Sequence, residues 1–386
     1  MNMKMIENEI QVLGTSRRRK NRFRPVWWSL VIVMAVVITT FIIHHLGCPE
    51  KTYVSTIDNS LQMKVDSLLR EKMFELNALS GQAIVMDVKS GEMKALVGIS
   101  QMDGTLHTDN DVFAIQQESG LVQGVSFMAA LASKNVHLTD SVDTQDGVLT
   151  IEGSDLKDHN WYRGGYQNIT VEQALHVSSN IGIYKSVKKA FGKGQGYFEM
   201  LEKMSYGMPD SIEGITGLKK GELKNQQFNR NETYLAWSCI GYEHAIAPIQ
   251  MLTFYNAIAN NGKMVKPRLY EGEIEVINPQ IADSTSIKAM QYTLEGVVSR
   301  GLGKQAGSEL TSTAGKTGSS QIYASEDEGL PSIYSVEFCG YFPADAPKYS
   351  IIVSITKPGY PASGGGMAGP VFREIVDYMC EHFLNE

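Results

Sequence analysis

Two short polar motifs in the chain contain residue types that can together bind an anionic ligand. Lys316-Thr317-Gly318 lies in an apolar, strand-like segment, and Ser178-Ser179-Asn180 stands directly before a helical pattern. A lysine, hydroxyls and an amide that converge can bind an anionic ligand, and they can move protons when a nucleophile is present. Each motif alone has a simpler interpretation, because K-T-G is a frequent tripeptide and a serine is a common helix N-cap. Their meaning therefore depends on the rest of the chain.

Several longer segments accompany these two motifs in a fixed order. They are Ala257-Ile-Ala-Asn-Asn-Gly-Lys-Met-Val-Lys-Pro267, Phe338-Cys-Gly-Tyr-Phe-Pro-Ala-Asp-Ala-Pro347 and Gly366-Met-Ala-Gly-Pro-Val-Phe372. In this order and spacing, the set resembles the transpeptidase domain of class B penicillin-binding proteins, which act in cell division and elongation. The resemblance covers almost everything from Thr56 to the C-terminal helix. It implies a β-lactamase/transpeptidase-like α/β fold and serine acyl transfer on D-Ala-D-Ala peptides.

The resemblance also assigns roles to individual residues. In the family, the serine of an S-x-x-K motif attacks the peptide, and the lysine one helical turn later takes its proton. S-x-N relays protons and holds the substrate amide, while the lysine and hydroxyl of K-T-G bind the substrate carboxylate. The N–H after the K-T-G glycine forms half of the oxyanion hole. The resemblance implies no cofactor and no metal, and the retained cleft residues are Ser178, Asn180, Lys316, Thr317, Gly318 and Ser319.

The nucleophile segment departs from the family pattern, which reads roughly E-P-G-S-T-x-K-P. Without gaps, Glu118-Ser-Gly-Leu-Val-Gln-Gly124 puts Leu121 at the serine position and Gly124 at the lysine position. No shift of register restores the motif, because neither Ser119 nor Ser126 is followed by a lysine three residues later. Leucine has no nucleophilic atom and glycine supplies no base, and loss of such a nucleophile typically lowers turnover by ~10⁶.

The leading functional interpretation is therefore a catalytically inactive homologue of peptidoglycan synthesis enzymes. It would act as a binding or scaffolding partner of cell-wall synthesis or division proteins, with a peptidoglycan stem peptide or a β-lactam as ligand. One alternative is an active D,D-transpeptidase with a relocated nucleophile, for which Ser126 is the nearest candidate and Lys316 or Ser178 would assist. Another is a ligand-sensing ectodomain that signals through a membrane anchor.

The elements that must position these residues follow from the hydrophobic periodicity. Two strand-like runs around Ser90-Gly91 form a hairpin, a largely helical block follows over about 120–265, and three strands and a closing helix end the chain. This order predicts an α/β domain with a mostly antiparallel five-stranded sheet, flanking helices and an all-helical subdomain. The predicted elements are a helix over 61–76, strands within 83–97 and at 310–323, 333–341 and 349–355, and a helix over 371–383.

The N-terminal region has the composition of a signal anchor. A cluster of six basic residues between Arg17 and Arg24 precedes an uncharged apolar run from Trp27 to Ile43. The run is too long for a cleaved signal peptide and has no A-x-A-like site after it. We therefore predict a cytoplasmic tail over 1–26, a transmembrane anchor over 27–46 and an extracytoplasmic transpeptidase-like domain over 47–386. This organisation predicts a single-pass protein of the bacterial inner membrane, without the pedestal domain that family members usually carry.

The net charge and the cysteine spacing argue against two further kinds of function, nucleic-acid binding and metal binding. The net charge of −7 and the single dense basic run at the N-terminus argue against a nucleic-acid partner. The spacing of the four cysteines does not indicate a metal site. Residue 339 lies in an apolar strand-like segment and residue 380 on the terminal helix; buried free thiols are favoured, and a bridge between these two stays open. The four are Cys48, Cys239, Cys339 and Cys380.

Overall fold

The computed structural model describes residues 24–45, 53–223, 231–323 and 331–384. The chain divides into two units, Met1–Tyr53 and Val54–Glu386. In the first unit, α1 spans Arg24–His45. The predicted tail up to residue 23, and Cys48, lie outside the described residues. Within the described ranges, no helix combines the length and the apolar character that are needed to cross a membrane.

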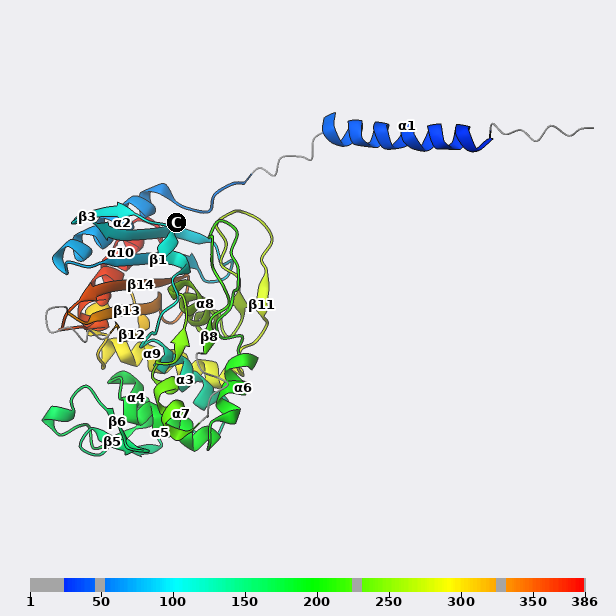
Figure 1. Cartoon of the computed structure of the whole chain (residues 1–386). Helices are drawn as coiled ribbons and strands as arrows, with labels where there is room; N and C mark the ends of the chain where they lie inside the picture. The colour runs from blue at the N-terminus through cyan, green and yellow to red at the C-terminus, as the bar shows by residue number, and fades with distance from the viewer. Residues whose placement is uncertain (1–23, 46–52, 224–230, 324–330, 385–386) are drawn as a thin grey trace, which may run out of the picture. The chain divides into compact units, whose positions relative to one another are not determined.

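A six-stranded sheet forms the centre of the second unit (Figure 1). The strand order is β12-β13-β14-β1-β2-β3, and every neighbouring pair is antiparallel. The β12 strand, which carries the K-T-G motif, is therefore an edge strand. The strands are β1 (Ser80–Asp87), β2 (Met93–Met102), β3 (Thr105–Thr108), β12 (Ala314–Tyr323), β13 (Ile333–Phe342) and β14 (Tyr349–Pro358).

Helices cover both faces of this sheet. Side chains alternate across each strand, so each strand contributes apolar residues to a core on either face. In β14, Ile351 and Val353 belong to the core beneath α2 (Asn59–Glu75) and α10 (Gly369–His382), whereas Ile352 belongs to the core on the other face. On that second face, α8 (Pro248–Ala259) packs against β13 and β14, and α9 (Ser284–Ser299) packs against β12. Figure 1 shows these layers, with the remaining helices beyond α8 and α9.

The predicted all-helical subdomain is wrong in one respect, because short strand pairs interrupt its helices. Its helices are α3 (Val122–Ala132), α4 (Val171–His176), α5 (Asn180–Phe191), α6 (Gln195–Lys203) and α7 (Glu232–Cys239). The pairs are β4 (Ser141–Asp143) with β7 (Asn168–Thr170), β5 (Val148–Ile151) with β6 (Ser154–Lys157), and β8 (Glu222–Leu223) with β9 (His244–Ala245). A further pair joins β10 (Met264–Val265) to β11 (Val276–Asn278). These strands are too short to show a period of two in the sequence.

The sheet has six strands where the sequence predicted five. The additional strand is β3, which pairs with β2 through a turn at Asp103 and Gly104, both with positive φ. Asp-Gly is a favoured pair for a two-residue hairpin, so this turn was a usable signal. The strand itself was missed because its four residues are mostly exposed and have no apolar alternation. The other predicted strands and the two predicted helices are confirmed with shifts of a few residues at their ends.

The three described cysteines are free thiols. Cys239 and Cys339 are buried, as the sequence predicted, whereas Cys380, for which burial was also predicted, is only half-buried. No bridge joins Cys339 to Cys380.

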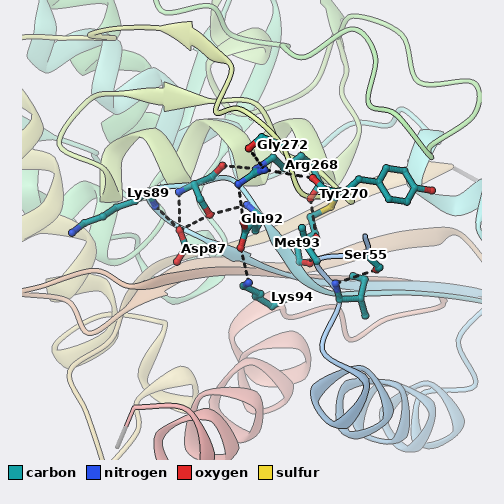
Figure 2. Close-up of polar contacts among 12 residues, drawn as sticks. Ser55, Asp87, Lys89, Glu92, Met93, Lys94, Arg268, Tyr270 and Gly272 are labelled. Carbon is teal, nitrogen blue, oxygen red and sulfur yellow. Dashed lines mark hydrogen bonds and ion pairs between the residues drawn. The ribbon is translucent and has the colours of Figure 1, made fainter. Parts of the chain in front are cut away.

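A polar network ties the start of the second unit to the sheet (Figure 2). Arg268 donates to Glu92 at 2.7 Å and to the carbonyl of Gly272 at 2.6 Å, and Lys94 donates to the second oxygen of Glu92 at 2.6 Å. Thr56 donates its hydroxyl to the carbonyl of Met93 at 2.8 Å. One arginine therefore connects the β1–β2 hairpin to the segment after β10, beside which the chain enters the domain.

We expect Arg268→Met to lower the free energy of unfolding by about 1.5–3 kcal/mol, because its charged hydrogen bonds are largely shielded from water. The matched control is Lys189→Met, which removes an ion pair to Asp140 in which the lysine side chain is 53% exposed, for a loss of about 1 kcal/mol or less. Urea unfolding of the two variants measures the difference. Equal losses would contradict a central role for Arg268.

Candidate functional site

Leu121 occupies the start of α3, at the position where the family has its serine. Its side chain is fully buried, and a Cβ placed on Gly318 would lie 3.0 Å from Leu121 Cγ. Leu121 therefore packs against the glycine of K-T-G. Its carbonyl accepts a hydrogen bond from the Tyr255 hydroxyl at 2.8 Å. The nucleophile position is filled by an apolar side chain that α8 holds in place.

Gly124, at the family's lysine position, has no room for any side chain. A Cβ added there would lie 2.0 Å from the Tyr255 hydroxyl oxygen and 2.9 Å from its ring carbon. Tyr255 is fully buried on α8 and its hydroxyl is held by the Leu121 carbonyl, so the ring cannot simply swing away. Tyr255 therefore occupies the space in which a lysine side chain would begin. No motif or periodicity in the sequence indicated this contact.

Three of the retained residues meet in one hydrogen-bonded group, the lysine cluster, which consists of Ser178, Lys316 and Thr317. Lys316 Nζ lies 2.6 Å from Ser178 Oγ, 2.6 Å from the Thr317 carbonyl and 3.5 Å from Thr317 Oγ1. The two hydroxyl oxygens are 3.4 Å apart. Lys316 is fully buried, and this burial lowers its pKa to about 7 because the charged form loses its hydration. The structure thus brings together the residues that the family uses for a carboxylate.

A buried aspartate positions the S-x-N turn. Ser179 is the N-cap of α5, and its hydroxyl donates to Asp158 Oδ2 at 2.8 Å. The other oxygen of Asp158 accepts from the Ile181 N–H at 3.0 Å. Burial raises the pKa of Asp158, and these bonds oppose the shift. Asp158 therefore fixes Ser178, which has a φ of +51° in the left-handed region. No sequence signal identified Asp158.

Asn180 is held by protein partners on both sides of its amide. Its Oδ1 accepts from Gln123 Nε2 at 2.7 Å, and its Nδ2 donates to the carbonyl of Lys157 at 2.7 Å. Gln123 is buried and follows the filled nucleophile position on α3. Its amide thus joins α3 to the S-x-N turn beside Gly124, which stands at the family's lysine position. Sequence reasoning did not identify Gln123, because glutamine at that position matches no motif.

Gly318 and Ser319 lie where β12 meets the start of α3. A Cβ on Gly120 would be 2.6 Å from the Ser319 nitrogen, so the segment directly before α3 passes closely over β12. Ser319 Oγ accepts from the Gly364 N–H at 2.9 Å, which links the strand to the segment before α10. Both residues are therefore next to Leu121, as their family positions require.

Ser126 is not part of this arrangement. Its side chain is fully buried in the helical block, where its hydroxyl donates to the carbonyl of Cys239 at 2.8 Å and lies 2.8 Å from the Tyr197 hydroxyl. Its contacts are therefore with α6 and α7, and no hydrogen bond joins it to the lysine cluster. Ser126 lies on the part of α3 that packs into the core, so these contacts do not favour a relocated nucleophile there.

A second buried titratable group lies behind Leu121. Glu337 on β13 accepts from Ser119 Oγ at 2.5 Å and from Ser354 Oγ at 3.2 Å. It is 1% exposed, and no described cation pairs with it. Burial raises its pKa to about 7, and the hydroxyl donors oppose that shift. Ser119 also accepts from the Leu121 N–H at 3.2 Å, so this carboxyl is linked to the nucleophile loop.

Comparison with known proteins agrees with this fold. The model of the penicillin binding protein transpeptidase domain matches residues 81–377. Penicillin-binding protein PbpB of Mycobacterium tuberculosis is 24% identical over 365 residues, covering 87% of this chain and 53% of PbpB. Peptidoglycan D,D-transpeptidase FtsI of Escherichia coli is 23% identical, covering 83% of this chain and 54% of FtsI. The transpeptidase domain of Burkholderia pseudomallei penicillin-binding protein 3 superimposes with a TM-score of 0.72 at 23% identity, covering 88% of this chain and 98% of that domain.

The fold and the site thus define a transpeptidase-like α/β domain built on an antiparallel sheet. The chain belongs to the penicillin-binding protein transpeptidase family. It spans about half the length of the curated relatives that it matches.

The predicted clash between a side chain at position 124 and the Tyr255 hydroxyl can be tested by a double-mutant cycle. We expect Gly124→Ala to lower the free energy of unfolding by about 1–3 kcal/mol, because its methyl group overpacks against the Tyr255 hydroxyl. Tyr255→Phe removes that hydroxyl. The loss of unfolding free energy in the double variant should therefore be smaller, by at least about 0.5 kcal/mol, than the sum of the losses in the two single variants. Chemical denaturation gives all three values. Gly272→Ala is the control, because the nearest atom to a Cβ added there is 3.9 Å away. This variant should change the free energy of unfolding little. Strict additivity would show that the two residues do not collide.

The buried Glu337 carboxyl should make stability depend on pH. Its pKa is raised from 4.5 to about 7, so between these values the folded chain keeps a proton that the unfolded chain releases. Stability should therefore fall as the pH rises from 5 to 8, by about 2.5 kcal/mol from this group alone. Glu337→Gln should remove that part of the fall, as measured by urea unfolding at both pH values. Parallel pH profiles for the two proteins would contradict this prediction.

Proposed function

We propose that this family member is a non-catalytic binding protein of the bacterial cell envelope. Its ligand would be a peptide with a free carboxylate, of the D-Ala-D-Ala type found on peptidoglycan stems, and its partners would be cell-wall synthesis or division proteins. The proposal includes attachment to the inner membrane through residues 27–46, with the domain outside; carbonate extraction of membranes from cells that express the chain would test this attachment.

The observation that carries the proposal is the contrast between the two halves of the site. The half that performs chemistry in the family has lost both reactive atoms, and Tyr255 fills the space where the lysine at position 124 would begin. The half that binds a carboxylate keeps its lysine and two hydroxyls within hydrogen-bonding distance. A lysine and hydroxyls can bind an anion without forming a covalent bond.

The ligand carboxylate would bind to the hydroxyls of Ser178 and Thr317, with Lys316 behind them. Ser178 is half-buried and Thr317 is 8% exposed, whereas Lys316 itself has no exposed surface. An anion at the hydroxyls would favour the protonated form of Lys316, since an opposite charge raises the pKa of an amine. Binding is therefore coupled to proton uptake above pH 7.

This coupling predicts a pH-dependent affinity for an acetylated L-Lys-D-Ala-D-Ala peptide. Because the pKa of free Lys316 is about 7, the dissociation constant should rise about tenfold between pH 6 and pH 8. Lys316→Met should abolish this dependence and weaken binding at pH 6 at least tenfold. Isothermal titration with the full-length chain measures both effects.

Two controls belong to this experiment. The same peptide with a C-terminal amide should not bind measurably, and Lys189→Met, which changes an exposed lysine, should bind like the parent chain. Equal affinity for the acid and the amide would rule out carboxylate recognition by the lysine cluster.

A further inference from the structure

We propose that Ser178 is an acyl-accepting serine, with Lys316 as its base, and that it forms a covalent ester with activated acyl donors such as β-lactams and p-nitrophenyl esters. This activity goes beyond the reversible binding proposed above. It also differs from the chemistry of the family, in which the serine at position 121 would be acylated.

A neutral amine at Lys316 can also satisfy the three partners of its Nζ. Such an amine has two N–H donors and one lone pair. Its two N–H groups can donate hydrogen bonds to the carbonyl oxygen and the hydroxyl of Thr317, which lie 2.6 and 3.5 Å from Nζ. The lone pair is then directed to Ser178 Oγ, which lies 2.6 Å away. In this form the lysine accepts the proton of the Ser178 hydroxyl, as the base of a Ser–Lys dyad does.

The surroundings favour that neutral form. Among the described residues, no carboxylate forms an ion pair with Lys316, and burial alone lowers its pKa to about 7. His159 is a nearby titratable group on the loop after β6; burial lowers its pKa, although Asp158 opposes that shift, so the imidazole is neutral at pH 7. Its partner Tyr166 has a pKa raised to about 12 and is also neutral. Asp158 is directed to Ser179 and the Ile181 N–H.

The backbone holds Ser178 in a fixed and accessible position. Its φ of +51° places it on a tight turn between α4 and α5, in a conformation that non-glycine residues seldom adopt. The next residue, Ser179, anchors the turn through Asp158. Ser178 is half-buried, so an acyl carbon can approach its hydroxyl from solvent. A strained turn that presents a serine to solvent also occurs at the nucleophiles of other serine hydrolases.

The neighbouring serines lack this combination of a base and access. Ser119 has a carboxylate partner but is only 2% exposed. Ser126 and Ser179 are fully buried. Ser320 donates to the carbonyl of Glu118 and is 5% exposed. Ser178 is therefore the serine near the start of α3 that has both a basic nitrogen within hydrogen-bonding distance and a route from solvent.

The reaction is an acyl transfer without any redox change. Ser178 Oγ forms a bond to the carbonyl carbon, and the C–N bond of the lactam or the C–O bond of the ester breaks. The hydroxyl proton moves to Lys316 Nζ and then to the leaving nitrogen or oxygen. A strained or activated donor is needed, because the family's own nucleophile and base are absent.

The pH dependence separates this activity from reversible binding. Binding of a carboxylate needs protonated Lys316 and weakens above pH 7, whereas acylation needs neutral Lys316 and accelerates there. The rate of adduct formation should rise about fivefold from pH 6 to pH 7 and approach a plateau above pH 8.

The test is incubation of the full-length chain with fluorescent penicillin and, separately, with p-nitrophenyl acetate, followed by intact mass and peptide mapping. We expect one adduct per chain, located on the peptide that contains Ser178. Ser178→Ala and Lys316→Met should each slow adduct formation at least a hundredfold, whereas Ser126→Ala should leave it within twofold. No adduct on the folded parent chain at saturating donor would overturn the proposal, and so would an adduct at another serine. Either result would leave the peptide titration above unaffected.

A second measurement covers the case in which Ser178→Ala does not fold. Ser178→Cys differs from the parent chain in one atom and should be alkylated by iodoacetamide at residue 178. If Lys316 acts as the base, this alkylation should be at least tenfold faster than in the Ser178→Cys/Lys316→Met double variant at pH 7.5. Equal rates in the two proteins would rule out proton transfer between residues 178 and 316.

Discussion

The hydrogen bond from the Tyr255 hydroxyl to the Leu121 carbonyl determines what this site can contain. It joins two residues 134 positions apart and places the hydroxyl where a side chain on Gly124 would begin. The helix that carries Tyr255 is buried along its whole length and packs against β13 and β14. The tyrosine therefore cannot move without disturbing the sheet. Leucine and glycine at the motif positions are accommodated by the core, and two substitutions alone would not rebuild the family motif.

The other half of the site is held by separate contacts. Asp158 fixes the S-x-N turn through Ser179, and β12 carries Lys316 as part of the central sheet. Neither support involves the side chains at positions 121 and 124. Gln123 adds a bond to Asn180 from the side of α3. Because these supports are independent, the lysine cluster keeps its geometry although the residues at the start of α3 have changed.

The sequence predicted most of the scaffold and only part of the site. K-T-G and S-x-N were found because each lies within a short contiguous motif, and β12 and α5 bring them together as the resemblance implies. The contacts that were missed join residues far apart in sequence, such as Tyr255 with position 124 and Asp158 with Ser179. Such pairs have no local periodicity to reveal them. Ser126 was chosen for its closeness in sequence, but it belongs to the part of α3 that packs into the helical core.

Lys316 and Glu337 lie on neighbouring strands, and each is buried without an ion pair among the described residues. Burial moves the pKa of both to about 7, from opposite directions. A buried, unpaired ionisable group lowers stability, and an apolar side chain of similar size would avoid that loss. Packing of the core therefore gives no reason for a lysine at position 316. Its hydrogen bonds to Ser178 and Thr317 do give one, because they direct a basic nitrogen to the only half-buried hydroxyl of the lysine cluster. This geometry is useful for holding an anion or accepting a proton, and it is unnecessary for a purely structural strand.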